Sequence, residues 1–215
     1  MATTPVEIKR VLISLFAVGI IETVAGTLAT KIPADSLSLL GVVRTVEAVV
    51  ILLIFSQQIN GIAAIGISKE TAWNGLLRGL ICSAGFGIIV FAGFIILFLV
   101  DIDPFSLVRM PLPAERPRLI GFIIVGGLIS PVAEELFFRG VVFGYFRRWG
   151  FWMALIVSTA GFIAAHLSGN RLPITQAVGG VVFGVAYEKT GSLAAPITIH
   201  VLGNLAIFAL SILKG

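Results

Sequence analysis

Long apolar runs separated by short polar interruptions occupy most of this chain. A helix that crosses a membrane needs about 20 mainly apolar residues, because each residue adds about 1.5 Å of rise. Seven runs approach or exceed that length, at residues 11–30, 37–56, 76–100, 119–146, 151–167, 173–188 and 193–213. The pattern therefore predicts an all-α, polytopic bundle of about seven transmembrane helices, with six or eight spans as the alternatives.

Two longer interruptions divide these runs. Residues 57–75 are of mixed composition and predict a connecting loop with a short interfacial helix, whose Trp73 would lie at the level of the lipid headgroups. Residues 101–118 are rich in proline and predict the longest linker between helices. The run at 173–188 is short and interrupted by small residues, so it either spans the membrane or lies half-buried in the bundle.

The composition supports a membrane protein and excludes several soluble classes. Hydrophobic residues make up 58% of the 215 residues and charged residues only 12%, against about 25% charged residues in an average soluble domain. The net charge is +4, but the 15 Lys and Arg residues are scattered over short loops and helix ends, so no nucleic-acid partner is predicted. The single cysteine, Cys82, cannot form an intramolecular disulfide, so packing must hold the fold together.

Few ionisable side chains lie inside the apolar runs, and those few are candidates for function. A charged side chain at the centre of a bilayer costs about 3 kcal/mol or more unless it is paired or hydrated. Both histidines of the chain belong to this set, together with an adjacent Glu-Glu pair, and this coincidence predicts one buried polar site. The full set is Glu22, Arg44, Glu47, Glu134, Glu135, Arg139, His166 and His200.

The first polar motif lies at residues 130–140, in the sequence SPVAEELFFRG. In a helix, Glu135 and Arg139 are one turn apart and can form an ion pair that makes one carboxylate tolerable in lipid. Glu134 points about 100° away from that pair, so it is a candidate general base whose partners come from another helix. The alternative is a structural ion pair, with Glu134 facing a water pocket. Pro131 is expected to open the backbone hydrogen-bond ladder and admit water.

Two further motifs contain the histidines. In GFIAAHL, Phe162 is four residues before His166, so its ring can pack beside the imidazole and fix its orientation. In PITIHVLGN, His200 and Asn204 are also one turn apart, so the amide can hydrogen-bond to the imidazole or line the same cavity. Each motif alone is typical of a histidine satisfied within a core. Three such motifs on three apolar helices favour a common site.

Together the three motifs contain the groups that amide hydrolysis requires. A carboxylate beside two imidazoles can activate water, and an imidazole with an amide N–H can stabilise an oxyanion. No covalent nucleophile is indicated, because neither Ser130 nor Ser158 lies in a nucleophile motif. The alternative chemistry is a zinc site of His166, His200 and Glu134, although the HExxH signature is absent. Direct activation of water by glutamate is the preferred interpretation.

The order and spacing of these motifs resemble those of a known family. The ordered triple resembles the CPBP intramembrane proteases, also called the Abi or CAAX-protease family, which include the CAAX prenyl endopeptidases. The resemblance extends over residues 130–204, and no motif residue is missing. The matching motifs are EExxxR (Glu134, Glu135, Arg139), FxxxH (Phe162, His166) and HxxxN (His200, Asn204).

The resemblance implies a role for each motif residue. Glu134 would be the general base that polarises water, with His166 positioned to assist it. His200 and Asn204 would form the oxyanion-stabilising pair. No cofactor would be required, although zinc at the two histidines and Glu134 stays open as the alternative. The remaining motif residues would brace the site or contact the substrate; these are Glu135, Arg139 and Phe162.

We therefore expect an intramembrane endopeptidase that hydrolyses a peptide bond of a membrane-associated protein or peptide by glutamate-activated water. The alternatives are a non-catalytic membrane scaffold or bacteriocin-immunity-type protein, and a proton-coupled transporter, against which the lack of an internal repeat counts. Residues 1–215 are expected to form a single integral membrane domain, with the catalytic core helices in 119–213. The expected partners are membrane lipid and a protein or peptide substrate, and the expected location is a bacterial or archaeal cytoplasmic membrane.

The ionisable residues outside the motifs are expected to be structural. Arg44 and Glu47 are three residues apart and are predicted to pair with each other. Glu22 is predicted to face a neighbouring helix or the cavity.

Overall fold

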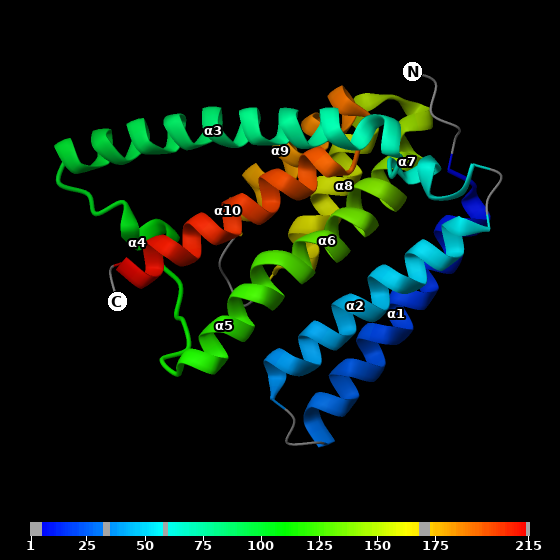
Figure 1. Ribbon diagram of the computed structural model, residues 1–215, viewed down its shortest axis with the longest axis horizontal. Coiled ribbons are helices and arrows are strands. Elements are labelled where there is room, and N and C mark those ends of the chain that lie inside the picture. The colour runs from blue at the N-terminus through cyan, green and yellow to red at the C-terminus, as the bar shows by residue number, and fades with distance from the viewer. Residues whose placement is uncertain (1–5, 32–34, 58–59, 168–172, 214–215) are drawn as a thin grey trace.

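The computed structural model describes residues 6–31, 35–57, 60–167 and 173–213, and all regular elements within these ranges are helices (Figure 1). The predicted all-α architecture is confirmed, and each of the seven apolar runs lies largely in a helix. Within the described ranges, five helical stretches are long and apolar enough to cross a membrane. They are Ile8–Lys31, Ser36–Ser56, Gly61–Leu99, Arg116–Trp149 and Ala194–Leu213.

Two of the seven predicted helices are shorter than a membrane span. Helix α8 (Phe151–Ala165) has 15 residues and α9 (Ile174–Thr190) has 17. At about 1.5 Å per residue they reach about 23–26 Å, less than the hydrocarbon thickness of about 30 Å. Because α8 packs against α9, and α9 against α10 (Ala194–Leu213), the bundle itself holds both short helices in place.

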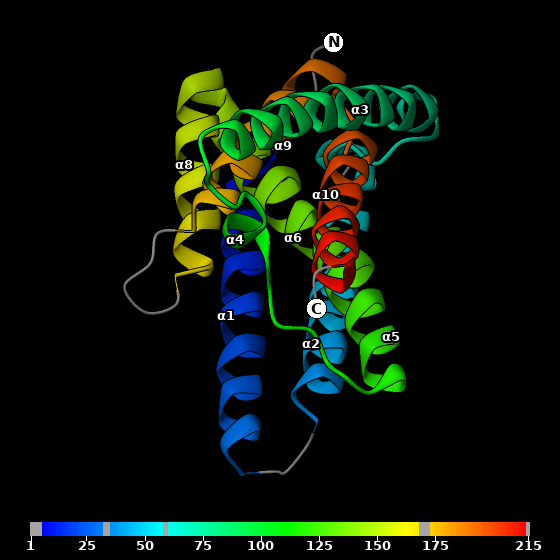
Figure 2. The same cartoon turned by 90° about the vertical axis from the view of Figure 1, so that its left-hand side faces the viewer.

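The first two helices form an antiparallel hairpin (Figure 1, Figure 2). Helix α1 (Ile8–Lys31) lies beside α2 (Ser36–Ser56). Asp35 caps the start of α2, because its side chain accepts a hydrogen bond from the Ser38 backbone N–H at 3.3 Å. Ile51 on α2 is completely buried in the core. Many outward side chains of the hairpin are large, apolar and exposed, as a surface in contact with lipid requires.

The mixed segment before the third span is shorter than the sequence predicted. It contains one stretch of 3-10 helix, η1 (Gly61–Ile65), and α3 (Lys69–Leu99) then begins several residues before the apolar run does. The reason is a polar start signal, because the Ser68 hydroxyl accepts a hydrogen bond from the Thr71 N–H at 3.3 Å and caps the helix. Trp73 is exposed in the first turns of α3, where a headgroup-level residue is expected.

Helix α3 crosses α10 through small residues, and it lies across one end of the bundle in both views (Figure 1, Figure 2). A side chain added at Gly75 would come within 2.6 Å of Ser192 Oγ, and one at Gly79 within 2.8 Å of Thr198 Cβ. Glycines one turn apart therefore allow the two backbones to approach closely, as is common between membrane helices.

The proline-rich linker contains a single turn of helix, α4 (Phe105–Val108). The backbone N–H of Met110 donates a hydrogen bond to Ser211 Oγ at 3.2 Å, which ties the linker to the end of α10. The prediction of a long break between the third and fourth spans is therefore confirmed, with one helical turn added.

The fourth span is a continuous helix that contains two π-helical stretches. In π-helices the backbone hydrogen bonds run from residue i to residue i−5, and such stretches are frequent at functional sites. Pro131, in the first turn of α6, lacks the N–H that an α-helix would use. Helix α6 packs against α2 and α10 and lies between the two π-helices. In chain order the span consists of α5 (Arg116–Ile124), η2 (Val125–Ile129), α6 (Ser130–Glu135), η3 (Leu136–Phe143), α7 (Gly144–Phe146) and η4 (Arg147–Trp149).

Candidate active site

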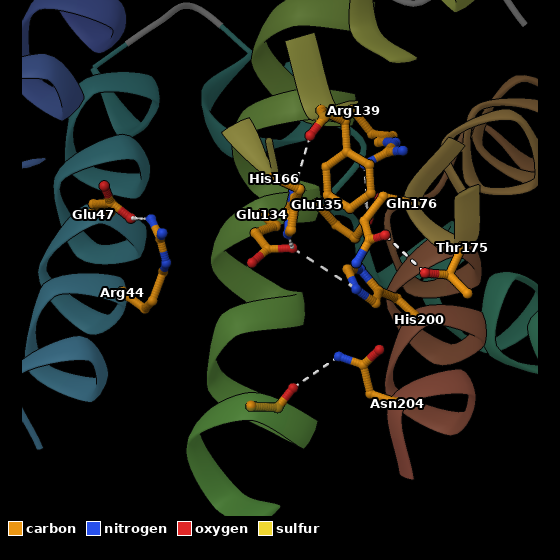
Figure 3. Close-up of polar contacts among 12 residues, drawn as sticks. Arg44, Glu47, Glu134, Glu135, Arg139, His166, Thr175, Gln176, His200 and Asn204 are labelled. Carbon is orange, nitrogen blue, oxygen red and sulfur yellow. Dashed lines mark hydrogen bonds and ion pairs between the residues drawn. The ribbon is translucent and has the colours of Figure 1, made fainter. Parts of the chain in front are cut away.

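Glu134, His166 and His200 come together from three helices in the middle of the bundle (Figure 3). Glu134 lies on α6, His166 directly follows α8, and His200 lies on α10. Glu134 Oε2 is 3.8 Å from Nε2 of His166 and 3.8 Å from Nε2 of His200. The exposed fractions of the three side chains are 12%, 27% and 8%, so the cluster is enclosed but reachable. Residues from all three motifs therefore meet at one place.

The imidazole of His166 is held by the helix that precedes it. Its Nδ1 lies 2.9 Å from the carbonyl oxygen of Phe162. Because a carbonyl oxygen only accepts hydrogen bonds, Nδ1 donates, and the Nε2 of the neutral ring carries a lone pair. The Phe162 ring lies 4.5 Å from the imidazole, so the packing expected from the one-turn spacing is present. Nε2 is thereby directed toward Glu134.

His200 is held in a similar way by the buried ion pair of the first motif. Its Nδ1 donates to Glu135 Oε1 at 2.8 Å, and Arg139 Nη1 donates to the same oxygen at 3.0 Å. The Glu135 and Arg139 side chains are completely buried. A buried ion pair is tolerated only where further hydrogen bonds satisfy it, and His200 supplies one of them. The Nε2 of His200 then presents its lone pair to Glu134.

Gly180 and Phe183, two residues of α9 that the sequence did not predict as part of the site, also contact Arg139 and His200. The Arg139 guanidinium lies 4.7 Å from the centre of the Phe162 ring and 5.1 Å from that of Phe183. Phe183 also stacks on His200, with a centroid distance of 4.6 Å and an interplanar angle of 20°. Arg139 Nη2 donates to the carbonyl oxygen of Gly180 at 3.3 Å. The only signal in the sequence is that Gly180 and Phe183 are three residues apart, on one face of a helix.

Asn204 lies on α10 one turn after His200, and its side-chain amide donates a hydrogen bond to the backbone of η2 (Figure 3). Its Nδ2 donates to the carbonyl oxygen of Gly126 at 2.8 Å. In an α-helix the Ser130 N–H would donate to Gly126, but here it donates to Val125. In a π-helix the donor would be residue 131, which is a proline without an N–H. Asn204 therefore supplies the donor that the backbone lacks.

The remaining ionisable residues of the apolar runs form a separate cluster. Arg44 Nη1 lies 2.6 Å from Glu47 Oε2 and 2.7 Å from Glu22 Oε1. The predicted Arg44–Glu47 pair is therefore present, and Glu22 on α1 reaches across to join it. Figure 3 shows this pair on α2, beside the helix that carries Glu134.

The donor atoms of this site are of the kind that bind a metal ion. Both imidazoles present an unprotonated Nε2 to a carboxylate, which is the donor set that zinc prefers. However, no group of three or more His, Cys, Asp or Glu side chains in the described part of the chain is arranged to hold a metal ion.

The part of the chain that contains the three motifs is similar to known membrane proteases. Residues 116–206 match the model of a family described as type II CAAX prenyl endopeptidase Rce1-like. The membrane-embedded CAAX protease MroQ of Staphylococcus aureus is 38% identical over 90 residues, which are 39% of this chain and 36% of MroQ. The putative membrane peptidase YdiL of Bacillus subtilis is 30% identical over 83 residues, 38% of this chain and 34% of YdiL.

A third relative is an uncharacterised 24.3 kDa protein of Escherichia coli, 28% identical over 89 residues, 39% of this chain and 41% of that protein. The matched segment thus spans only 34–41% of the length of these relatives. No solved structure matches the chain. With its helices of spanning length, the chain is an integral membrane protein. The matched segment contains all three motifs, and over residues 116–206 the chain is similar to the Rce1-like type II CAAX prenyl endopeptidase family.

Proposed function

We propose that this chain is an intramembrane endopeptidase that hydrolyses a peptide bond of a membrane-associated protein or peptide. The observation that carries the proposal is the convergence of two imidazole nitrogens on one carboxylate oxygen, each at 3.8 Å. The names of MroQ, a CAAX protease, and YdiL, a putative membrane peptidase, support this reaction class over the matched segment.

The three converging atoms are suited to hold water. Glu134 Oε2 and the two imidazole Nε2 atoms all accept hydrogen bonds. Their separations of 3.8 Å are too long for direct hydrogen bonds. Water can donate two hydrogen bonds, and it can lie about 2.8 Å from both atoms of such a pair. We infer that this position holds the water molecule that attacks the substrate.

Glu134 is proposed to act as the general base. It takes a proton from water while the water oxygen attacks the peptide carbonyl carbon, and the electron pair of the C=O bond moves onto the carbonyl oxygen. The protonated Glu134 then passes this proton to the amide nitrogen, the C–N bond breaks, and a carboxylic acid and an amine leave. His166 accepts a hydrogen bond from the same water and orients it. Positioned acid–base groups of this kind contribute about 10²–10⁴-fold in rate.

The oxyanion is proposed to be stabilised from α10. The amide nitrogen of Asn204 carries two N–H groups, and because only one is required by Gly126, the other is available. His200 joins it as a donor once its Nε2, which carries a lone pair in the resting site, has taken up a proton, and the Glu135 carboxylate at 2.8 Å then balances that charge. Arg139 holds Glu135, and thereby His200, in place.

The proposed reaction uses no metal or other cofactor. Each step above is assigned to a side chain of this protein. We propose that the enzyme acts in a bacterial or archaeal cytoplasmic membrane, with lipid around it and a protein or peptide as its substrate.

Exchange of Glu134 for glutamine tests the proposal. Membranes from a bacterium that expresses the wild-type chain, Glu134→Gln or Glu115→Gln are incubated, and new peptide termini are quantified by mass spectrometry. Glu115 is a matched control because its side chain is 71% exposed and lies outside the site. We expect a set of termini that appears with the wild-type chain and Glu115→Gln and is absent with Glu134→Gln.

Identical termini in all three samples would reject the enzyme. The scaffold alternative then predicts that Glu134→Gln loses partner binding or folding without any change in peptide cleavage. The transporter alternative predicts pH-driven flux in liposomes that Glu134→Gln abolishes.

A further inference from the structure

The site described above is rich in hydrogen-bond acceptors and poor in donors. The Nδ1–H of His166 is used by a backbone carbonyl, and that of His200 by the Glu135 carboxylate. One amide N–H of Asn204 is used by Gly126. A tetrahedral intermediate at a peptide carbonyl carries a negative oxygen and requires donors aimed at it. The three motifs therefore leave the oxyanion with few donors.

Gln176 lies on the face of α9 that is turned toward this site. It precedes Gly180 by four residues and Phe183 by seven, so all three side-chain positions share one face of the helix. Gly180 accepts a hydrogen bond from Arg139, and Phe183 stacks on His200. Figure 3 shows the Gln176 side chain extending from α9 toward His200. Its placement thus follows from the helix face and agrees with the view.

The side-chain amide of Gln176 is oriented by a hydrogen bond to its oxygen. The Thr175 hydroxyl donates to Gln176 Oε1 at 2.7 Å, so the acceptor end of the amide is occupied. Among the described residues, Gln176 Nε2 makes no hydrogen bond, and the side chain is only partly buried. Two N–H donors of a neutral amide are therefore available on the face of α9 that carries Gly180 and Phe183.

We propose that Gln176 is a further catalytic residue of this chain, which donates an N–H from its carboxamide to the carbonyl oxygen of the scissile peptide bond. The donor strengthens as that oxygen becomes negative, so it acts on the transition state more than on the bound substrate. This inference rests on the proposed endopeptidase activity. None of the three family motifs contains Gln176.

The test separates turnover from binding. A quenched fluorescent peptide is made that spans the strongest cleavage site found with wild-type membranes, and it is supplied to the purified chain in liposomes. The variants are Gln176→Glu, which keeps the shape and exchanges the donors for a carboxylate, and Gln176→Leu, which removes hydrogen bonding. Gln57→Leu makes the same change at an exposed position outside the site, and Glu134→Gln serves as the inactive reference.

We expect both Gln176 variants to lower kcat about a hundredfold, with KM within twofold of the wild-type value, because loss of one oxyanion donor typically costs that much. Their thermal unfolding in detergent should match that of Gln57→Leu. Unchanged kcat, or a rise in KM alone, would overturn the role of Gln176 while Glu134→Gln stays inactive and the proposed function stands. If wild-type membranes yield no cleavage site, the proposed function fails, and this inference with it.

Discussion

The amide nitrogen of Asn204 lies 2.8 Å from the carbonyl oxygen of Gly126 and replaces the backbone donor that Pro131 removes. This hydrogen bond connects α10 to the continuous helix that carries Glu134, which follows Gly126 in the same helix. The π-helical turn and the third motif are therefore physically coupled. Asn204 has a structural task beside the proposed role in oxyanion stabilisation.

Removal of the Asn204 amide should destabilise the protein in a way that depends on residue 131. We expect Asn204→Leu to lower the free energy of unfolding by about 1–3 kcal/mol, because the partly buried Gly126 carbonyl is left without a donor. In a Pro131→Ala background the new backbone N–H can donate to Gly126, so the loss should be much smaller. Unfolding in mixed detergent, followed by circular dichroism, measures both effects.

The matched control for this cycle is Asn74→Leu, an exposed asparagine on α3 whose loss should change stability little. Equal destabilisation by Asn204→Leu in the wild-type chain and in the Pro131→Ala variant would show that the two positions are independent.

Loss of the cation from the buried Glu135–Arg139 pair should destabilise the protein much more than loss of the cation from an exposed pair. Arg139→Met leaves the completely buried Glu135 carboxylate without its guanidinium, and we expect a loss of about 3–5 kcal/mol in the free energy of unfolding. Arg118→Met removes the partner of Glu115 at 3.6 Å, but that pair is exposed and should contribute little. Denaturation curves of both variants give the comparison, and similar losses would contradict the description of Arg139 as the support of Glu135.

A larger residue at Gly180 should be tolerated only when Thr159, which packs against it, is made smaller. A Cβ at this position would come within 2.7 Å of Thr159 Cγ2 on α8, so Gly180→Ala should cost about 1–3 kcal/mol by overpacking. Thr159→Ser removes that methyl group and should restore most of the stability in the double variant. Gly203→Ala, where nothing lies within 4 Å, serves as the control and should be neutral or stabilising. A double variant as unstable as Gly180→Ala alone would show that the contact is not the cause.

Removal of metal should leave the activity intact. The purified chain is dialysed against a strong chelator, its metal content is measured by mass spectrometry, and cleavage of the identified peptide is followed. We expect kcat within about twofold of the untreated value, because the proposed reaction assigns every proton transfer to side chains. Loss of activity that stoichiometric Zn²⁺ restores would instead support the two-histidine, one-carboxylate alternative.

Contacts within one helix were predictable from the sequence because helical geometry fixes them. Residues three or four apart face each other in any helix, so the Glu135–Arg139 pair and the Phe162–His166 packing follow from spacing alone. The same holds for Arg44 and Glu47. The helices themselves follow from apolar length, apart from the start of α3, which a serine cap determines.

Contacts between helices were predictable only in part. The presence of rare polar residues in lipid implies that they meet, and Glu134 does lie near both imidazoles. The partner of Asn204, however, is a backbone carbonyl exposed by a π-helical turn, and no side-chain pattern reveals it. Phe183 is one aromatic residue among many in an apolar chain, so its stacking on His200 depends on how α9 is rotated.

The π-helical turn at Val125–Ile129 bears on how this domain can change in evolution. Such a turn accommodates one more residue than an α-helical turn does. A chain one residue shorter at this point would present its glutamate in the same direction through a regular α-helix. Alignments of related chains should therefore place single-residue gaps within this turn, while the length of the segment that follows Pro131 is conserved.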